Sequence, residues 1–260
     1  MDNIVFSLNN FEYFLLILVR IASFIFIAPI FGQNGIPRQI KIGLSFFISI
    51  FMYNIVEYPT LNYGGIIGYS ILVLKEGITG LLIGFAANIC SSIVLFAGNI
   101  IDMDIGLSMA TEFNPEINNQ VTVTGNLYYY ALMLMLLATN MHIYVLRAVC
   151  DSFHLIPIGG AEIQWDHLMI TFSGFMTDLM VIGFRIFLPC FACIMILNCI
   201  LGVMAKVAPQ MNMFSIGMQL KILVGLTVLF LTVFLLPQMA EMIFDEIKLM
   251  VGSVIESIHK

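Results

Sequence analysis

The stretch ITGLLIGFAANICSSIVLFAGNII, residues 78–101, decides the fold because it carries no charged side chain. A helix that crosses the hydrocarbon core of a bilayer needs about 20 predominantly apolar residues. Backbone N–H and C=O groups have no water to bond in hydrocarbon, so a segment of this kind must pair them internally. Residues 78–101 are therefore predicted to form a membrane-embedded helix.

Further apolar stretches lie on both sides of this one. Each is too long and too continuous to be a barrel strand, which would alternate in polarity over about 10 residues. The predicted fold class is therefore all-α, a multi-helix bundle embedded in a membrane. The additional stretches are residues 14–31, 42–56, 127–146, 186–205 and 222–240.

The composition agrees with this class. Hydrophobic residues make up 60% of the chain and charged residues 10%, whereas a soluble domain carries roughly 45–50% and about 25%. Mean hydropathy is +1.02. One soluble core could not hide this surplus, so much of the surface must face lipid or partner proteins. The net charge of −6 offers no basic surface for nucleic acid.

Several features conflict with a simple series of spanning helices. Residues 168–205 are about twice as long as one span, whereas residues 64–74 are apolar but too short to cross. Arg38 and Lys41 mark the first loop as cytoplasmic, but strict alternation would then place the acidic segment 102–116 on the same side. Broken helices and hairpins buried among partner proteins would produce this pattern. No polar linker divides the chain, so residues 1–260 are predicted to form a single membrane-embedded subunit.

The C-terminal tail, residues 241–260, has a different pattern. Apolar residues recur there at near-helical spacing, and acidic and basic residues lie between them. This pattern is typical of an amphipathic helix that packs on a membrane surface or on a partner.

No catalytic, cofactor or metal site is predicted. Cys190 and Cys193 have C-x-x-C spacing, but they lie in an uncharged apolar stretch with no second pair. A zinc site usually needs four ligands, and a reactive thiolate needs a cationic neighbour or a helix N-terminus. The four His residues form no H-x-x-x-H or H-E-x-x-H pattern. An intramembrane enzyme is therefore disfavoured.

Arg20, Asp178 and Arg185 lie in apolar stretches. A charge there costs about 2.5–3.5 kcal/mol on insertion scales, so each needs a reason to be present. Asp178 and Arg185 are two helical turns apart and share a face. Three interpretations remain open: a structural ion pair, an arginine whose charged end extends to the membrane surface, and a contact with another subunit. Pro189 favours the contact, because it would bend the helix at this point.

Gly80 and Gly84 form a G-x-x-x-G pattern. Small residues at this spacing let two helix backbones approach closely. The pattern predicts a tight helix–helix contact, either inside the chain or between chains.

The segment GLSMATEFNPEINNQVTVTG, residues 106–125, separates two of the best apolar stretches. It mixes apolar side chains with glutamates and asparagines, and Pro115 follows Asn114, a turn initiator. Non-helical backbone at membrane depth is tolerated only where it is buried in protein or lines a water-filled path. The alternative is an ordinary exposed loop.

Several of these residues together resemble a known family. Nearly end to end, the chain is similar to the FliR family of the flagellar type III export apparatus, whose counterpart in virulence injectisomes is closely similar. One departure is Asn140-Met141-His142 where Asn-Gly-His would be expected, which puts in doubt the need for a glycine turn there. The matching residues are Arg20, Ala28 to Gly32, Pro37-Arg38, Glu76-Gly77, Gly80, Gly84, Gly106 to Ala110, Asn114-Pro115, Asn140, His142, Ser152-Phe153, Ile156-Pro157, Gly202, Lys206, Ala208 to Asn212, Phe214 to Gly217 and Lys221.

The resemblance implies a place in a helical assembly rather than an activity. Family members assemble with two other small hydrophobic proteins, FliP and FliQ, into the entry portal for unfolded export substrates, and a switch protein, FlhB, contacts the assembly. The subunit looks like a fusion of the hairpin architectures of FliP and FliQ, which would account for the long stretch at 168–205. The implied location is the bacterial inner membrane, in the flagellar basal body.

The resemblance also assigns roles to particular residues. The loop matching 106–125 lies in the pore of family members and helps to plug it. The residues expected to form the plug are Gly106, Met109, Glu112, Phe113, Asn114, Pro115 and Asn118. Those expected at subunit interfaces are Arg20, Gly80, Gly84, Asp178, Arg185, Lys206, Pro209, Gln210, Asn212 and Lys221.

Two rival functions are open beside the flagellar export gate. The first is an injectisome export subunit, which would carry the same motifs. The second is a secondary transporter with broken helices and charged residues near the midplane. A transporter of that kind would require an inverted repeat, and the sequence shows none.

Overall fold

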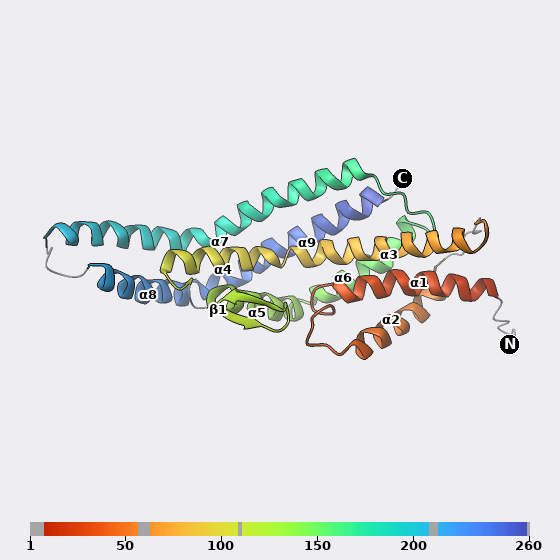
Figure 1. The fold of residues 1–260 in the computed structure, drawn as a ribbon, viewed down its shortest axis with the longest axis horizontal. Helices are drawn as coiled ribbons and strands as arrows, with labels where there is room; N and C mark the ends of the chain where they lie inside the picture. The colour runs from red at the N-terminus through yellow and green to blue at the C-terminus, as the bar shows by residue number, and fades with distance from the viewer. Residues whose placement is uncertain (1–7, 57–62, 109–110, 208–212, 259–260) are drawn as a thin grey trace. The chain divides into compact units, whose positions relative to one another are not determined.

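The computed structural model describes residues 8–56, 63–108, 111–207 and 213–258, and it is almost entirely helical (Figure 1). This confirms the all-α class. One short β-hairpin, which the sequence did not predict, interrupts the helices. The elements in chain order are α1 (Leu8–Ile27), α2 (Arg38–Tyr53), α3 (Gly65–Ile89), α4 (Ser92–Ile105), β1 (Thr111–Asn114), β2 (Asn119–Thr122), α5 (Val123–Ala138), α6 (Met141–Leu155), α7 (Trp165–Val207), α8 (Met213–Thr232), the 3-10 helix η1 (Val233–Leu235) and α9 (Leu236–Ile258).

Packing divides the chain into two compact units, which are described separately. Unit 1 comprises Met1–Ile89, Asn140–Phe175 and Glu246–Lys260. Unit 2 comprises Cys90–Thr139 and Met176–Asp245.

In unit 1, helix α1 packs against both α2 and α3. A Cβ atom on Gly80 of α3 would lie 2.1 Å from the carbonyl oxygen of Arg20 in α1, and one on Gly84 would lie 2.9 Å from that of Phe24. Only glycine permits so close an approach of the two backbones. The tight contact predicted from Gly80 and Gly84 is therefore made inside the chain, and a contact of these residues with another subunit stays a prediction.

Helix α2 has its polar side turned inward. Lys41, Ser45 and Ser49 are buried, and both serine hydroxyls donate to the carbonyl four residues earlier in the helix. The Lys41 ammonium donates to the carbonyl of Gly32 at 2.8 Å. Phe47, by contrast, is 58% exposed on the outer side. The outer face of α2 therefore requires apolar surroundings.

The C-terminal tail forms most of α9, and its apolar face is buried within the chain. In unit 1 the buried residues include Ile247, Val254 and Ile258. The N–H of Glu162 donates to the carbonyl of Ile258 at 3.2 Å, which ties the segment before α7 to the end of α9. The amphipathic pattern is thus used for packing inside the chain, where the sequence suggested a membrane surface or a partner.

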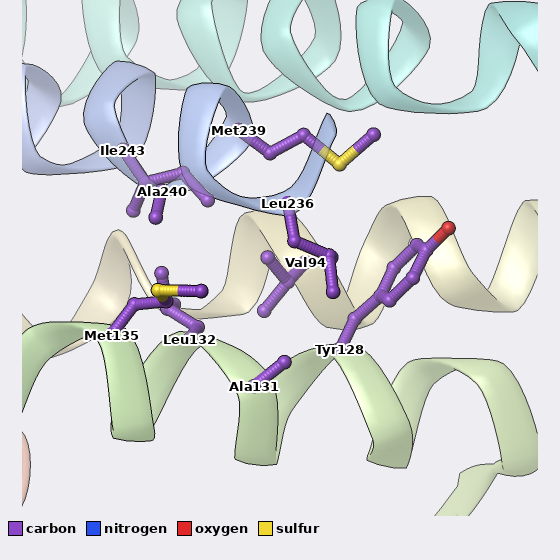
Figure 2. Close-up of a pocket in the computed structure, with 9 residues that line it drawn as sticks. All are labelled: Val94, Tyr128, Ala131, Leu132, Met135, Leu236, Met239, Ala240 and Ile243. Carbon is purple, nitrogen blue, oxygen red and sulfur yellow. The ribbon is translucent and has the colours of Figure 1, made fainter. Parts of the chain in front are cut away.

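In unit 2, helices α4 and α5 pack closely. A Cβ atom on Gly98 would lie 2.3 Å from the Cα atom of Gly125, so the two backbones touch at this point. Figure 2 shows the apolar pocket that α4, α5 and the start of α9 enclose, lined by residues such as Val94, Leu132 and Ile243. The N-terminal end of α5, at Gly125, is therefore held in a fixed position on α4.

Three of the predicted apolar stretches are interrupted, and one of them, residues 222–240, runs from α8 through the 3-10 helix η1 into α9. Residues 78–101 are divided between α3 and α4 at Cys90 and Ser91. Residues 127–146 were expected to be one helix, and that prediction was wrong. Asn140 adopts a left-handed conformation with φ of 58°, which ends α5 and starts α6. Asparagine tolerates this conformation better than most residues, and Met141, which stands where a glycine was expected, is already the first residue of α6.

Among the residues that the structure describes, three helical segments are long and apolar enough to cross a membrane, namely Gly65–Ile105, Trp165–Val207 and Ile216–Ile258. A fourth is added if α5 and α6 are counted as one broken span. The long stretch at 168–205 forms a single helix, α7, of 43 residues with Pro189 inside it. The pair α5–α6 is a broken helix of the kind expected from the sequence, whereas residues 168–205 form one continuous helix and not a hairpin.

Replacing Gly80 by alanine should destabilise unit 1, because the new methyl group would overlap the backbone of α1. We expect a loss of about 1–3 kcal/mol, the usual cost of overpacking, measured as a lower thermal unfolding midpoint in detergent. Gly43→Ala is the matched control, since a Cβ atom there meets nothing within 4 Å. Equal midpoints for the two variants would contradict this account of the α1–α3 contact.

Candidate functional site

The polar segment between α4 and α5 folds into a β-hairpin. Its strands β1 and β2 pair antiparallel, with Thr111 opposite Thr122 and Asn114 opposite Asn119. Asn118 closes the turn in a left-handed conformation with φ of 56°. Gly106 ends α4 with φ of 95°, a conformation that favours glycine. The predicted loop is therefore an ordered element.

The side chain of Asn114 organises the turn of the hairpin. Asn114 is fully buried, and its Oδ1 accepts the backbone N–H of Glu116 at 2.8 Å and that of Ile117 at 3.4 Å. Its Nδ2 donates to Oδ1 of Asn126, in the first turns of α5, at 2.6 Å. The Nδ2 of Asn126 donates in turn to Oε2 of Glu112 at 3.1 Å. One chain of hydrogen bonds therefore runs from the turn to the start of α5.

The base of the hairpin is held by a buried carboxylate. Asp102 in α4 is fully buried, and it accepts the backbone N–H of Thr124 at 2.8 Å and the Thr124 hydroxyl at 2.5 Å. The hydroxyl of Thr122 donates to Oδ1 of Asn99 at 2.9 Å. The base of the hairpin is therefore tied to α4 at two positions, Thr122 and Thr124.

The outer surface of the hairpin carries an exposed aromatic ring. Phe113 is 58% exposed, and Glu112, Pro115 and Asn118 are exposed as well. Partial burial raises the pKa of the Glu116 carboxyl above its ordinary value. Met109 lies outside the described residues. The hairpin can thus present an apolar side chain on a polar, ordered support.

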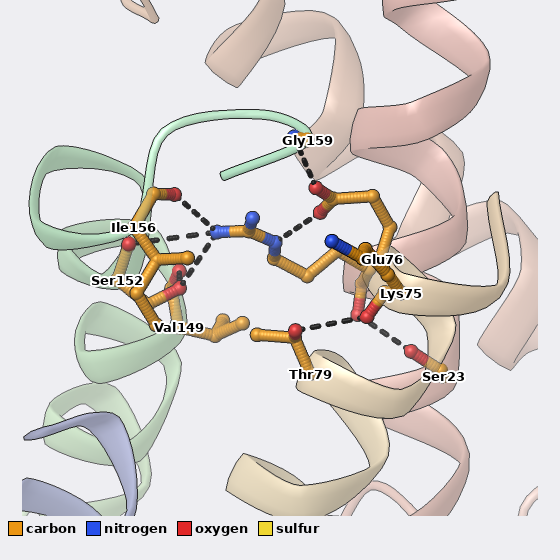
Figure 3. Close-up of polar contacts among 9 residues, drawn as sticks. Ser23, Lys75, Glu76, Thr79, Val149, Ser152, Ile156 and Gly159 are labelled. Atoms are coloured by element: carbon orange, nitrogen blue, oxygen red, sulfur yellow. Dashed lines mark hydrogen bonds and ion pairs between the residues drawn. The ribbon is translucent and has the colours of Figure 1, made fainter. Parts of the chain in front are cut away.

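Unit 1 contains a second polar cluster, which Arg20 forms with Glu76 and Ile156; Figure 3 shows these two partners. The Arg20 guanidinium and the Glu76 carboxylate are both fully buried, and Nε donates to Oε2 at 2.5 Å. Nη1 donates to the carbonyl of Ile156 at 3.0 Å. The guanidinium carbon lies 4.2 Å from the centre of the Phe153 ring. Arg20 therefore joins α1 to α3 and to the end of α6.

Glu76 extends this cluster to the loop that follows α6. Its Oε1 accepts the backbone N–H of Gly159 at 2.8 Å. Nη2 of Arg20 has no hydrogen-bond partner among the described residues. The structure places Arg20 inside the chain, so its predicted position at a subunit interface gains no support from the geometry.

Four of the remaining predicted interface residues belong to the part of the chain that the structure describes. Asp178 and Arg185 are exposed on α7, and no ion pair joins these two described side chains. Lys206 is exposed near the end of α7, and Lys221 is half-buried in α8. Pro209, Gln210 and Asn212 lie outside the described residues. The interface roles of these residues stay predictions.

Sequence reasoning missed Asp102, Thr124 and Asn126 as functional residues. The signal was present for Asp102, since a carboxylate at the end of an apolar stretch needs donors. Nothing in the spacing of Asn114 and Asn126 indicates that their amides meet. Glu76 entered only as a family marker, although a buried arginine on another helix requires an acidic partner.

The described residues include no group of three or more His, Cys, Asp or Glu side chains that could hold a metal ion. Cys190 and Cys193 are free thiols. The site therefore consists of hydrogen-bonded supports and an exposed apolar side chain, and what it can do is position chain segments.

The fold, the hairpin with its hydrogen bonds and the Arg20 cluster define a helical membrane protein in which these polar groups hold helices and the hairpin together. A comparison with protein families then identifies it more closely. The model of "Bacterial export proteins, family 1" matches residues 11–247, and the chain belongs to this family.

Relatives of known name agree with this assignment. The chain is 28% identical to the flagellar biosynthetic protein FliR of Bacillus subtilis over 225 residues, which covers 85% of this chain and 86% of the relative. It is 27% identical to FliR of Escherichia coli over 246 residues, covering 93% and 92%. FliR of Aquifex aeolicus is 26% identical, with 82% of each chain covered. The resemblance to FliR is thereby confirmed.

Replacing Arg20 by methionine should destabilise the chain by about 3–5 kcal/mol, because Glu76 would keep a buried charge without its partner. The double variant Arg20→Met/Glu76→Met should recover much of this loss, since a buried ion pair often gives way to apolar side chains at little cost. Thermal unfolding in detergent measures both. Arg185→Met, at an exposed position, is the control. A double variant less stable than either single one would contradict the pairing.

Proposed function

We propose that the chain is a non-enzymatic subunit of the flagellar type III protein export gate in the bacterial inner membrane, within the flagellar basal body. In this proposal the whole chain is one membrane-embedded subunit, and the hairpin at 106–125 closes the channel through which unfolded flagellar proteins pass. Membership of the bacterial export family and the similarity to named flagellar proteins support the flagellar choice over an injectisome.

The observation that carries the proposal is the exposed apolar surface of α7. Its 43 residues correspond to about 65 Å of helix if unbent. The hydrocarbon core of a bilayer is about 30 Å thick. Even a tilt of about 40° would leave roughly 50 Å along the membrane normal. Lipid tails therefore cannot cover the whole helix.

Apolar side chains are nevertheless exposed along all of α7. Trp165 at its start is 67% exposed, Leu188 in the middle 59% and Val207 at its end 79%. Contiguous exposed apolar surface marks a site of interaction with protein or membrane. Where lipid does not reach, other proteins must cover it, which is the situation of a subunit within a hydrophobic assembly.

The partners we propose are FliP-like and FliQ-like membrane subunits, with an FlhB-like switch protein in contact with the assembly. The exposed charges of Asp178, Arg185 and Lys206 would then meet polar groups of these neighbours, since each is costly against lipid. Lys221 and the segment with Pro209, Gln210 and Asn212 are assigned to the same interfaces. Gly80, Gly84 and Arg20 fix α1 on α3 within the chain, and their predicted contact with a neighbouring subunit stays part of the proposal.

The closing element is the hairpin. Phe113, together with Met109, would form an apolar constriction that excludes water and ions when no substrate is present. Glu112, Asn114, Pro115 and Asn118 fix the shape that holds Phe113 outward. Energy for export would come from another component, because this chain has no nucleotide-binding motif.

Replacing residues 112–121 by two glycines should leave the complex assembled but make the membrane leak ions, because the constriction is removed. Ion flux into cells or vesicles that contain the complex measures the leak. Recovery of the same partner proteins with the variant is the control for assembly. An assembled complex that stays fully tight would contradict the closing role.

The chain should be recovered from membranes together with FliP-like and FliQ-like proteins, in a complex of several kinds of chain. These neighbours are expected because the exposed apolar surface of α7 must be covered by other proteins where lipid does not reach. Affinity purification in mild detergent followed by mass spectrometry tests this. Recovery of a stable monomer or homo-oligomer alone would instead support a transporter.

A further inference from the structure

The two ends of the hairpin are attached in different ways. At the base, the Asp102 carboxylate accepts both the N–H and the hydroxyl of Thr124, and the backbones of Gly98 and Gly125 are in contact. These interactions combine two hydrogen bonds to one buried side chain with direct contact between two backbones. The base can therefore stay in place while the rest of the hairpin moves.

The turn end is joined to α5 through one side chain of that helix, Asn126, which bonds the Asn114 amide and the Glu112 carboxyl group. Asn126 is 7% exposed, accepts from Asn114 at 2.6 Å and donates to Glu112 at 3.1 Å. It thus contacts β1 through two different side chains. Intramolecular hydrogen bonds change the free energy little when bonds to water replace them, and Glu112 is already exposed. This attachment can be released and remade without unfolding α5.

We propose that Asn126 is a positioning residue that latches the hairpin in its closed position, a role that rests on the proposed closing function. The base at Asp102 and Thr124 acts as the pivot. An unfolded export substrate brings backbone N–H and C=O groups, which are the same kind of donor and acceptor as the amides of Asn114 and Asn126. A passing chain can therefore replace the latch bonds and release the turn end.

The variant Asn126→Leu tests this directly. Leucine is similar in size but cannot bond Asn114, whose buried amide would then lack a partner inside the closed hairpin. Two effects are expected in the full chain within its complex. Hydrogen exchange at the backbone amides of Glu116 and Ile117, which Asn114 holds, should become about tenfold faster. The resting complex should also leak ions without any substrate.

Two further variants sharpen the test. Asn114→Leu breaks the same bond from the other side, so the double variant should leak no more than the worse single one. Asn54→Leu is the matched control, because Asn54 is exposed and bonds only locally within its own helix, at Ile50. It should leave both exchange and leak unchanged.

Each outcome decides the matter. Unchanged exchange in Asn126→Leu, or faster exchange in a complex that stays tight, would overturn the latch. If Asn126→Leu fails to assemble, Asn126→Asp serves instead. It keeps an acceptor for Asn114 and sets a carboxylate against Glu112, so a leak supports the latch and tightness refutes it. If the complex with Asn126→Leu leaks no ions but the complex without residues 112–121 does, only the latch is rejected. If the complex without residues 112–121 also leaks no ions, the closing function itself is rejected.

Discussion

The constraint on which the structure depends is the mismatch between helix length and membrane thickness. Helix α7 is a single apolar helix of 43 residues, about twice as long as the hydrocarbon core can cover. Apolar side chains along its whole length need surroundings that lipid alone does not supply. A chain with this surface makes sense as part of a larger hydrophobic assembly, and this agrees with its membership of a bacterial export family.

Within such a chain, buried polar groups take the role that an apolar core has in a soluble protein. Lipid is as apolar as leucine, so burying apolar side chains gives little drive for one helix to choose another. The Arg20–Glu76 pair fixes α1, α3 and the end of α6 in unit 1. In unit 2, Asp102 and Asn126 fix the hairpin. Because one broken partner leaves a buried polar group unsatisfied, these contacts specify position strongly.

The sequence predicted the composition-driven features and missed those that depend on tertiary contacts. Uncharged stretches gave the helices, and Gly80 with Gly84 gave a close contact, because both follow from local chemistry. The break at Asn140 was missed, since a left-handed asparagine leaves no trace in hydropathy. The hairpin was missed because its strands are short and its mix of Glu and Asn resembles a loop. The pairing of Asn114 with Asn126 depends on the register of two strands and could not be predicted from spacing.

The central claim is that the hairpin faces the path of exported proteins. The most direct test places a photo-crosslinking amino acid at Phe113 in cells whose export is blocked by a substrate with a folded end. The account predicts crosslinks from position 113 to the stalled substrate. None should form from Ile66, which is 87% exposed at the start of α3. Crosslinks from position 113 to lipid alone would contradict the account. So would crosslinks to the stalled substrate from position 66 but not from position 113.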